Sequence, residues 1–191
     1  RNIHPHMKDI YCLIIIFSRG IMSAEKNELI YLYLKDGKVI IETRTDIAPN
    51  HVKRIINLIS EGQYDGVVFH RVIESFMAQT GDVEFGNSNN KDFNLSLAGT
   101  GGSDLPDLKA EFSKAHHVRG TVSMARSQDP NSANSQFFIC FDDALHLDGQ
   151  YTVWGQVIEG MEYIDMIKKG EGPNGSVADP DKIIKMEIAV Q

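Results

Sequence analysis

Short β-prone runs separated by turn-forming residues extend over most of the sequence, and this pattern restricts the possible folds more than any other feature. Lys, Asp, Gly and Lys at 35–38 separate the first two runs, which predicts a hairpin. Gly, Asn, Ser and Asp dominate residues 83–114, which predicts a long surface loop. The predicted strands cover residues 28–34, 39–43, 67–73, 76–80, 120–125, 136–141, 152–157 and 183–190.

Only two segments have the apolar spacing of an amphipathic helix. In the first, apolar residues recur at helical intervals from Val52 to Ile59, with Pro49 near the start and Gly62 after the end. The second covers residues 161–167 and lies between two glycines. Many strands with two helices predict a mainly β fold. We expect a closed antiparallel barrel with helices over its ends, because closure removes exposed sheet edges.

Length and composition are those of an ordinary globular protein. The 191 residues suit one domain, and 42% apolar with 24% charged residues is typical of such domains. A formal net charge of −7 argues against a nucleic-acid partner, since binding phosphates needs a basic face. The histidines and cysteines lack the spacings of zinc ligands, so we expect no metal site.

The N-terminus raises the question of cellular location. The apolar run at residues 11–17 is far shorter than the roughly 20 residues that span a bilayer, so no membrane partner is expected. Met22 resembles a natural start, which makes 1–21 an upstream or appended extension and 22–191 the domain. Cys140 lies in an apolar run and is expected to be a buried free thiol, which fits a reducing, cytoplasmic compartment. If residues 1–24 act as a signal peptide, the location is periplasmic instead.

Four motifs occur in a fixed order. Residues 68–82 read Val-Phe-His-Arg-Val-Ile-Glu-Ser-Phe-Met-Ala-Gln-Thr-Gly-Asp, and residues 120–126 read Gly-Thr-Val-Ser-Met-Ala-Arg. Asn-Ser-Gln-Phe-Phe-Ile follows at 134–139, then Leu-Asp-Gly at 147–149 and Val-Trp-Gly-Gln-Val at 153–157. In these motifs the chain resembles the cyclophilin family, over roughly residues 28–190. The resemblance implies a closed antiparallel eight-stranded β-barrel capped by two α-helices and peptidyl-prolyl cis-trans isomerase activity that assists protein folding.

The chemistry of the implied reaction suits these residue types. The amide before proline has a rotation barrier of about 18–20 kcal/mol. Its uncatalysed exchange takes about tens to hundreds of seconds. As the bond twists, the prolyl nitrogen regains a lone pair, and a fixed cationic donor stabilises this twisted state over the planar one. Arg71 is the natural donor, being permanently charged. No covalent bond forms or breaks, so neither a nucleophile nor a cofactor is expected.

The resemblance also assigns roles to individual residues. It implies an apolar pocket for the proline ring, a hydrogen bond from Gln79 to the substrate backbone, and a structural role for His70. Taken singly, most of these residues would be ordinary core or surface residues, and it is their joint occurrence at family spacing that favours a site. The implied catalytic residues are Arg71, Gln79 and Phe76, and the implied substrate-binding residues are Met77, Ala125, Arg126, Gln136, Phe138, His146, Leu147 and Tyr151.

The sequence departs from the family pattern around the expected pocket. Arg126 stands where many members have Asn, and Tyr151 where many have His. Glu74 and Ser75 replace a common Pro-Gly pair. His146 replaces a Trp that helps eukaryotic members bind cyclosporin, so we expect weak cyclosporin binding with isomerase activity retained. The pattern looks closer to bacterial members than to eukaryotic ones.

Two other functions compete with isomerisation. The first is a proline-peptide binding module or chaperone whose turnover is incidental, and the second is a β-barrel that encloses a small ligand. The expected partners of an isomerase are X-Pro-containing polypeptides, and we expect a monomer. Fold analogy alone does not decide between these functions.

Overall fold

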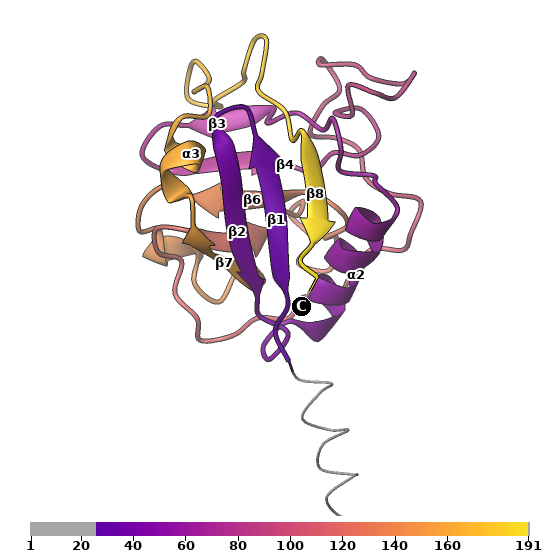
Figure 1. Ribbon diagram of the computed structural model, residues 1–191. Coiled ribbons are helices and arrows are strands. Elements are labelled where there is room, and N and C mark those ends of the chain that lie inside the picture. The colour runs from indigo at the N-terminus through magenta and orange to yellow at the C-terminus, as the bar shows by residue number, and fades with distance from the viewer. Residues whose placement is uncertain (1–25, 191) are drawn as a thin grey trace, which may run out of the picture.

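The computed structural model describes residues 26–190, and the expectations for the N-terminal extension lie outside this part of the chain. Within these residues, eight strands and two α-helices form the structure (Figure 1). Among the described residues, no helix is long and apolar enough to cross a membrane. The strands are β1 (Leu29–Leu34), β2 (Gly37–Thr43), β3 (Arg71–Ile73), β4 (Met77–Thr80), β5 (Thr121–Met124), β6 (Phe137–Cys140), β7 (Val153–Glu159) and β8 (Lys185–Ile188). The helices are α2 (Pro49–Ser60), α3 (Met161–Asp165) and the short 3₁₀ helix η1 (Leu145–Leu147).

The strands form one antiparallel sheet in the order β3-β4-β6-β5-β7-β2-β1-β8. The sheet curls until the segments that flank its two edge strands meet. There, Phe69 N donates to Asp181 O at 2.8 Å, and Ile183 N donates to Val67 O at 2.8 Å. The predicted antiparallel barrel with two helices is therefore confirmed.

This closure explains the main difference between the predicted and observed strands. The predicted strand at 67–73 contains only β3, because residues 66–69 leave the regular ladder to bond residues 181–183 and Gly86. The same contact delays the start of the predicted last strand, and β8 covers Lys185–Ile188. The second helix also ends earlier than predicted, at Asp165.

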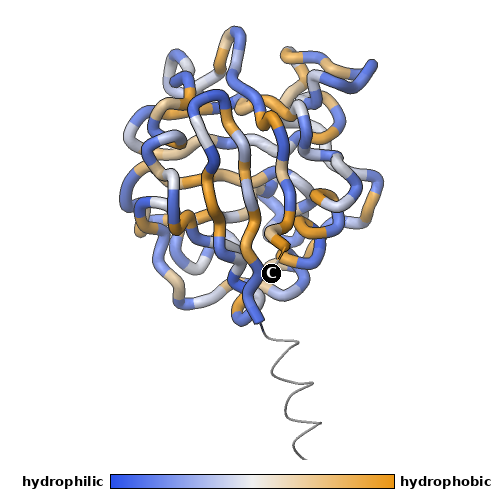
Figure 2. The backbone as a smooth tube through the Cα atoms, viewed as in Figure 1, coloured by the Kyte–Doolittle hydropathy of each residue, from blue (hydrophilic) through white to orange (hydrophobic). Residues whose placement is uncertain are grey.

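The barrel interior is filled by apolar side chains. Buried and half-buried residues alternate along β1, as a strand with one face toward a core requires. Figure 2 shows hydrophobic stretches concentrated in the strands that cross the centre of the view. One side of α2 covers the barrel with buried residues that include Val52, Ile55 and Leu58. Within residues 26–190, apolar side chains fill the barrel interior, which argues against the enclosed ligand of the alternative hypothesis. The largest fully buried side chains are Trp154, Tyr64, Phe69, Phe137, Ile30, Leu32, Ile41, Ile55, Leu58, Met77, Met124 and Ile139.

Candidate active site

A second apolar cluster lies apart from the main core and forms a pocket at the surface. Strand β6 supplies both clusters, since successive residues of a strand face opposite sides. Phe137 packs in the main core, whereas Phe138 packs with Met77 and Leu147 in the second cluster. We call the cavity over this cluster the apolar pocket. It is lined by Arg71, Phe76, Met77, Gln79, Ala125, Arg126, Phe138, Leu147 and Tyr151.

Strand register brings the polar side chains to the edge of the apolar pocket. Arg71 on β3 lies opposite Gln79 on β4, and Gln79 lies opposite Phe138 on β6. The Nη1 group of Arg71 donates to Gln79 Oε1 at 3.2 Å, and its Nε donates to the carbonyl oxygen of Asn174 at 2.9 Å. Two neutral acceptors thus hold the guanidinium in place, and its positive charge is not neutralised by a salt bridge among the described residues.

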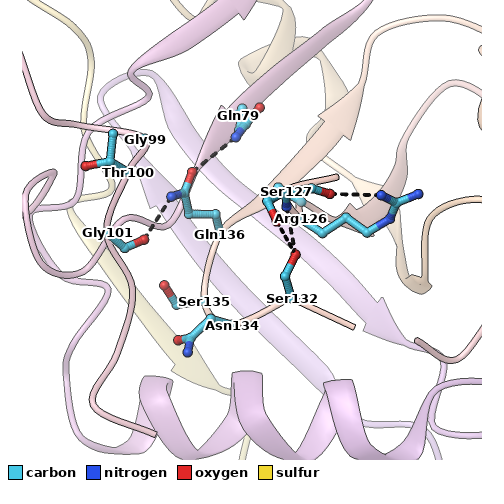
Figure 3. Close-up of a pocket in the computed structure, with 11 residues that line it drawn as sticks. Gln79, Gly99, Thr100, Gly101, Arg126, Ser127, Ser132, Asn134, Ser135 and Gln136 are labelled. Atoms are coloured by element: carbon cyan, nitrogen blue, oxygen red, sulfur yellow. Dashed lines mark hydrogen bonds between the residues drawn. The ribbon is translucent and has the colours of Figure 1, made fainter. Parts of the chain in front are cut away.

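Gln136 extends this arrangement into a neighbouring cavity. Gln79 Nε2 donates to Gln136 Oε1 at 3.1 Å, and Gln136 Nε2 donates to Gly101 O at 2.9 Å (Figure 3). The predicted residue Gln136 therefore lines not the apolar pocket but a second cavity, which we call the polar cavity. It is lined by Gln79, Gly99, Thr100, Gly101, Ala125, Arg126, Ser127, Ser132, Asn134, Ser135 and Gln136.

Asp82 holds the loop that forms the far wall of the polar cavity. Its buried carboxylate accepts hydrogen bonds from the backbone N–H groups of Glu84, Phe85, Gly99 and Gly101. A Cβ atom on Gly101 would lie 2.5 Å from Asp82 Oδ1, which explains the glycine at this position. The loop predicted at 83–114 is therefore fixed where it meets the site. Asp82 is the last residue of the first motif, but the sequence pattern assigned it no role in the site.

Behind the apolar pocket, a buried polar network supports Phe138. The imidazole of His117 stacks on the Phe138 ring, with centroids 6.1 Å apart and planes at 16°. His117 Nδ1 lies 2.9 Å from Asp148 Oδ1, and Nε2 lies 2.8 Å from Ser123 Oγ. The hydrogen bond from His116, together with those from His117, lowers the pKa of Asp148 to about 2, so the carboxylate stays ionised. Ser123 and Asp148 lie within two of the four motifs, but the sequence pattern assigned no role to them or to His117.

The remaining predicted residues lie around the rim of the apolar pocket. Phe76 lines it, whereas His146 is exposed, is not part of the lining and packs against Phe76, with ring centroids 5.7 Å apart. Tyr151 meets Phe138 edge-to-face at 5.8 Å. Ser75, in the turn before β4, adopts a φ of 64°, a left-handed conformation that glycine reaches more easily. The turn therefore forms even though Glu74 and Ser75 replace the Pro-Gly pair that is common in the family.

His70 is next to Arg71 in the chain but is unsuited to carrying protons at neutral pH. Its Nδ1 atom is buried and has no hydrogen-bond partner among the described residues. Burial lowers the pKa of His70 to about 4, outweighing the opposite effect of Asp82. The imidazole is therefore neutral near pH 7, in agreement with the structural role predicted for it.

The lowered pKa of His70 predicts a loss of stability in mild acid. Because the folded pKa is about 4 and the unfolded value 6.5, the unfolded state takes up the proton first as the pH falls. The stability that depends on neutral His70 is fully present above pH 6.5. It is lost toward pH 4 at a slope of at most about 1.4 kcal/mol per pH unit. His51 and His117 have pKa values lowered by burial and act in the same direction.

Urea unfolding at half-unit steps between pH 4 and 7 measures this effect. We expect His70→Gln to reduce the slope of unfolding free energy against pH in this range, because it removes the buried group whose pKa is about 4. Equal slopes in wild type and His70→Gln would contradict the assignment.

The site places a fixed cation, Arg71, beside an apolar pocket that can hold a ring. Arg71 contributes a permanent charge to the lining of the pocket, and Phe76, Met77, Phe138 and Leu147 supply apolar walls. Gln79 contacts Arg71 and lines both cavities. Such a site can hold an apolar ring and stabilise charge or a lone pair that develops beside it.

Comparison with known proteins agrees with this geometry. Residues 29–188 match the family described as cyclophilin type peptidyl-prolyl cis-trans isomerase/CLD. A probable peptidyl-prolyl cis-trans isomerase of Brucella abortus is 60% identical over 167 residues, which is 87% of this chain and 85% of that protein. Human peptidyl-prolyl cis-trans isomerase-like 3 is 37% identical over 139 residues, covering 72% of this chain and 80% of that protein.

Solved structures show the same fold. A cyclophilin of Hirschia baltica superimposes with a TM-score of 0.69 at 26% identity, over 85% of this chain and 75% of that one. A cyclophilin type isomerase of Cryptosporidium parvum superimposes with a TM-score of 0.73 at 23% identity, over 87% of this chain and 99% of that one.

Proposed function

Because the chain belongs to the cyclophilin-type peptidyl-prolyl cis-trans isomerase family, we propose that Arg71 is its catalytic residue and that the apolar pocket holds the substrate proline. The observation that carries this proposal is the unneutralised guanidinium of Arg71, fixed by Gln79 and Asn174 beside an apolar pocket. The substrates are X-Pro-containing polypeptides. A structure of the Cryptosporidium parvum relative was determined in the presence of the dipeptide Ala-Pro, which supports this substrate class.

The reaction follows from the arrangement of these groups. Phe76, Met77, Phe138 and Leu147 hold the proline ring, so that the acyl group before it rotates while the ring stays fixed. Rotation removes amide resonance and returns a lone pair to the prolyl nitrogen. An N–H of Arg71 donates to that lone pair in the twisted state, and the planar states offer no such acceptor. The interaction therefore lowers the barrier selectively, and no proton has to be transferred.

Two-dimensional NMR with an unlabelled Ala-Ala-Pro-Ala peptide tests where the substrate binds. We expect chemical-shift changes at Arg71, Ala125 and Phe138 and none at Leu58, which is buried in α2 away from the pocket. Changes centred on the open groove between α2 and residues 105–111 would contradict the proposed site.

Weak binding of cyclosporin is proposed from the exposed position of His146. An imidazole at the pocket rim offers less apolar area than the indole of many eukaryotic members. We expect His146→Trp to raise cyclosporin affinity by about tenfold, which corresponds to about 1.4 kcal/mol. Inhibition titrations of wild type and His146→Trp measure this change. Tight inhibition of the wild type at stoichiometric cyclosporin would contradict the proposal.

We also propose a monomeric protein of the cytoplasm. Cys140 supports the location, because this buried thiol is free among the described residues and therefore suits a reducing compartment. Burial raises its pKa to about 12, so it stays protonated and unreactive. Sedimentation velocity of the full chain measures the oligomeric state.

A further inference from the structure

Two departures from the family pattern, Arg126 and Tyr151, contact one another in the structure. The guanidinium of Arg126 lies over the Tyr151 ring, 4.5 Å from its centroid. Its Nε and Nη2 donate to Gln150 O at 3.0 and 2.7 Å, and Nη1 donates to Ser127 O at 2.9 Å. Since Tyr151 packs edge-to-face on Phe138, these contacts link Arg126 to the wall of the apolar pocket. The two substitutions therefore form one structural feature.

The partners of Arg126 fix its position without neutralising its charge. A backbone carbonyl and an aromatic ring are both uncharged, and Arg126 forms no salt bridge within residues 26–190. None of the residues that line the apolar pocket or the polar cavity carries a carboxylate. Arg71 and Arg126 are the charged residues of this lining. In a chain of net charge −7, they make the lining of the apolar pocket locally positive.

The direction of the Arg126 side chain determines where this charge acts. Figure 3 shows the side chain leading away from the polar cavity, with its guanidinium on the far side from Gly101 and Gln136. The charge lies instead at the rim of the apolar pocket, beside Tyr151. A polypeptide whose proline occupies the apolar pocket would therefore meet this charge with a residue close to the proline.

We propose that Arg126 makes the enzyme select X-Pro bonds that have a carboxylate side chain beside them. The proposal rests on the proposed function of the apolar pocket. A partly exposed ion pair adds a modest attraction, and a lysine at the same substrate position is repelled. Together these effects predict that kcat/KM is about threefold to tenfold higher for a glutamate peptide than for the matching lysine peptide.

Peptides with one variable position test this selectivity. In Ala-Xaa-Pro-Ala-Ala and Ala-Ala-Pro-Xaa-Ala, Xaa is Glu, Gln or Lys, and exchange is followed by NMR without a coupled protease. We expect a preference for Glu over Lys in at least one series with wild type. The preference should fall toward unity in Arg126→Gln and in 0.5 M salt, because salt at this concentration screens charges beyond about 5 Å. Arg126→Lys should keep much of the preference, since it keeps the charge.

The control removes a positive charge elsewhere. Lys53→Gln, at an exposed position of α2, lowers the net charge equally and should leave the Glu/Lys ratio at its wild-type value. A ratio unchanged by Arg126→Gln would contradict the proposal, even if overall activity fell through loss of the Tyr151 contact. A wild type that fails to accelerate exchange in the Gln peptide would instead contradict the function on which the proposal rests.

Discussion

Replacement of Arg71 by alanine is expected to lower kcat/KM for cis-trans isomerisation by about 10²–10³-fold, the usual cost of removing one donor that stabilises a transition state. The guanidinium is the group proposed to meet the prolyl lone pair. Arg126, the other cation in the lining of the apolar pocket, is held at the rim by Gln150 O and Tyr151. The fold should survive the change. Arg71 is half-buried, and its hydrogen bonds are to one side chain and one carbonyl in an exposed loop. Exchange NMR and urea unfolding of the same samples measure the two effects.

Arg71→Lys provides the matched control. It keeps the charge but lacks the planar fork that reaches Gln79 and Asn174 at the same time. We expect an activity between those of wild type and Arg71→Ala. If Arg71→Ala isomerised proline at the wild-type rate, the proposed mechanism would be wrong.

Replacing the two neighbouring phenylalanines of β6 one at a time should show that one mainly affects stability and the other mainly affects activity. Phe137 is fully buried in the main core, where it meets Tyr64 and Trp154 edge-to-face at 5.5 Å each. Phe137→Ala is therefore expected to lower the unfolding free energy by about 3–5 kcal/mol, because it leaves a cavity in a packed core. Its folded fraction should still bind and isomerise substrate.

Phe138→Ala should have its main effect on the reaction. Phe138 faces the apolar pocket, so its loss removes a wall that holds the proline ring. We expect KM to rise by about tenfold or more, since the lost contact area is worth at least about 1.4 kcal/mol. Urea unfolding and steady-state kinetics of both variants give the comparison. Normal KM in Phe138→Ala, or raised KM with unchanged stability in Phe137→Ala, would contradict the placement of the two rings.

Local pattern was enough to predict the strands, the first helix and the long loop. Each depends on neighbours in sequence, such as the Lys35–Lys38 turn or the spacing from Val52 to Ile59. The late start of β3, which begins at Arg71 instead of residue 67, could not be predicted in this way. Residues 66–69 bond residues 181–183, more than a hundred positions away, and that contact overrides their β propensity.

In the site, too, motif spacing predicted some features, whereas others depend on contacts that only the fold shows. Motif spacing indicated that Arg71, Gln79 and Phe138 belong together, and strand register places them side by side. The roles of Asp82 and His117 could not be predicted, because Asp82 acts by holding a loop in place and His117 by stacking on Phe138. Arg126 and Tyr151 were each visible as departures from the family pattern. Only the folded chain shows that they touch.

The central claim is that this site catalyses rotation and does not merely bind proline peptides. Exchange spectroscopy on a short Ala-Pro peptide tests it most directly, with protein at about one hundredth of the peptide concentration. Catalysis predicts faster exchange in both directions with an unchanged cis:trans ratio, and uncatalysed exchange at about tens to hundreds of seconds gives the baseline. Exchange that stays at the baseline, with a cis:trans ratio that shifts only as protein approaches peptide concentration, would contradict the claim and identify a binding module.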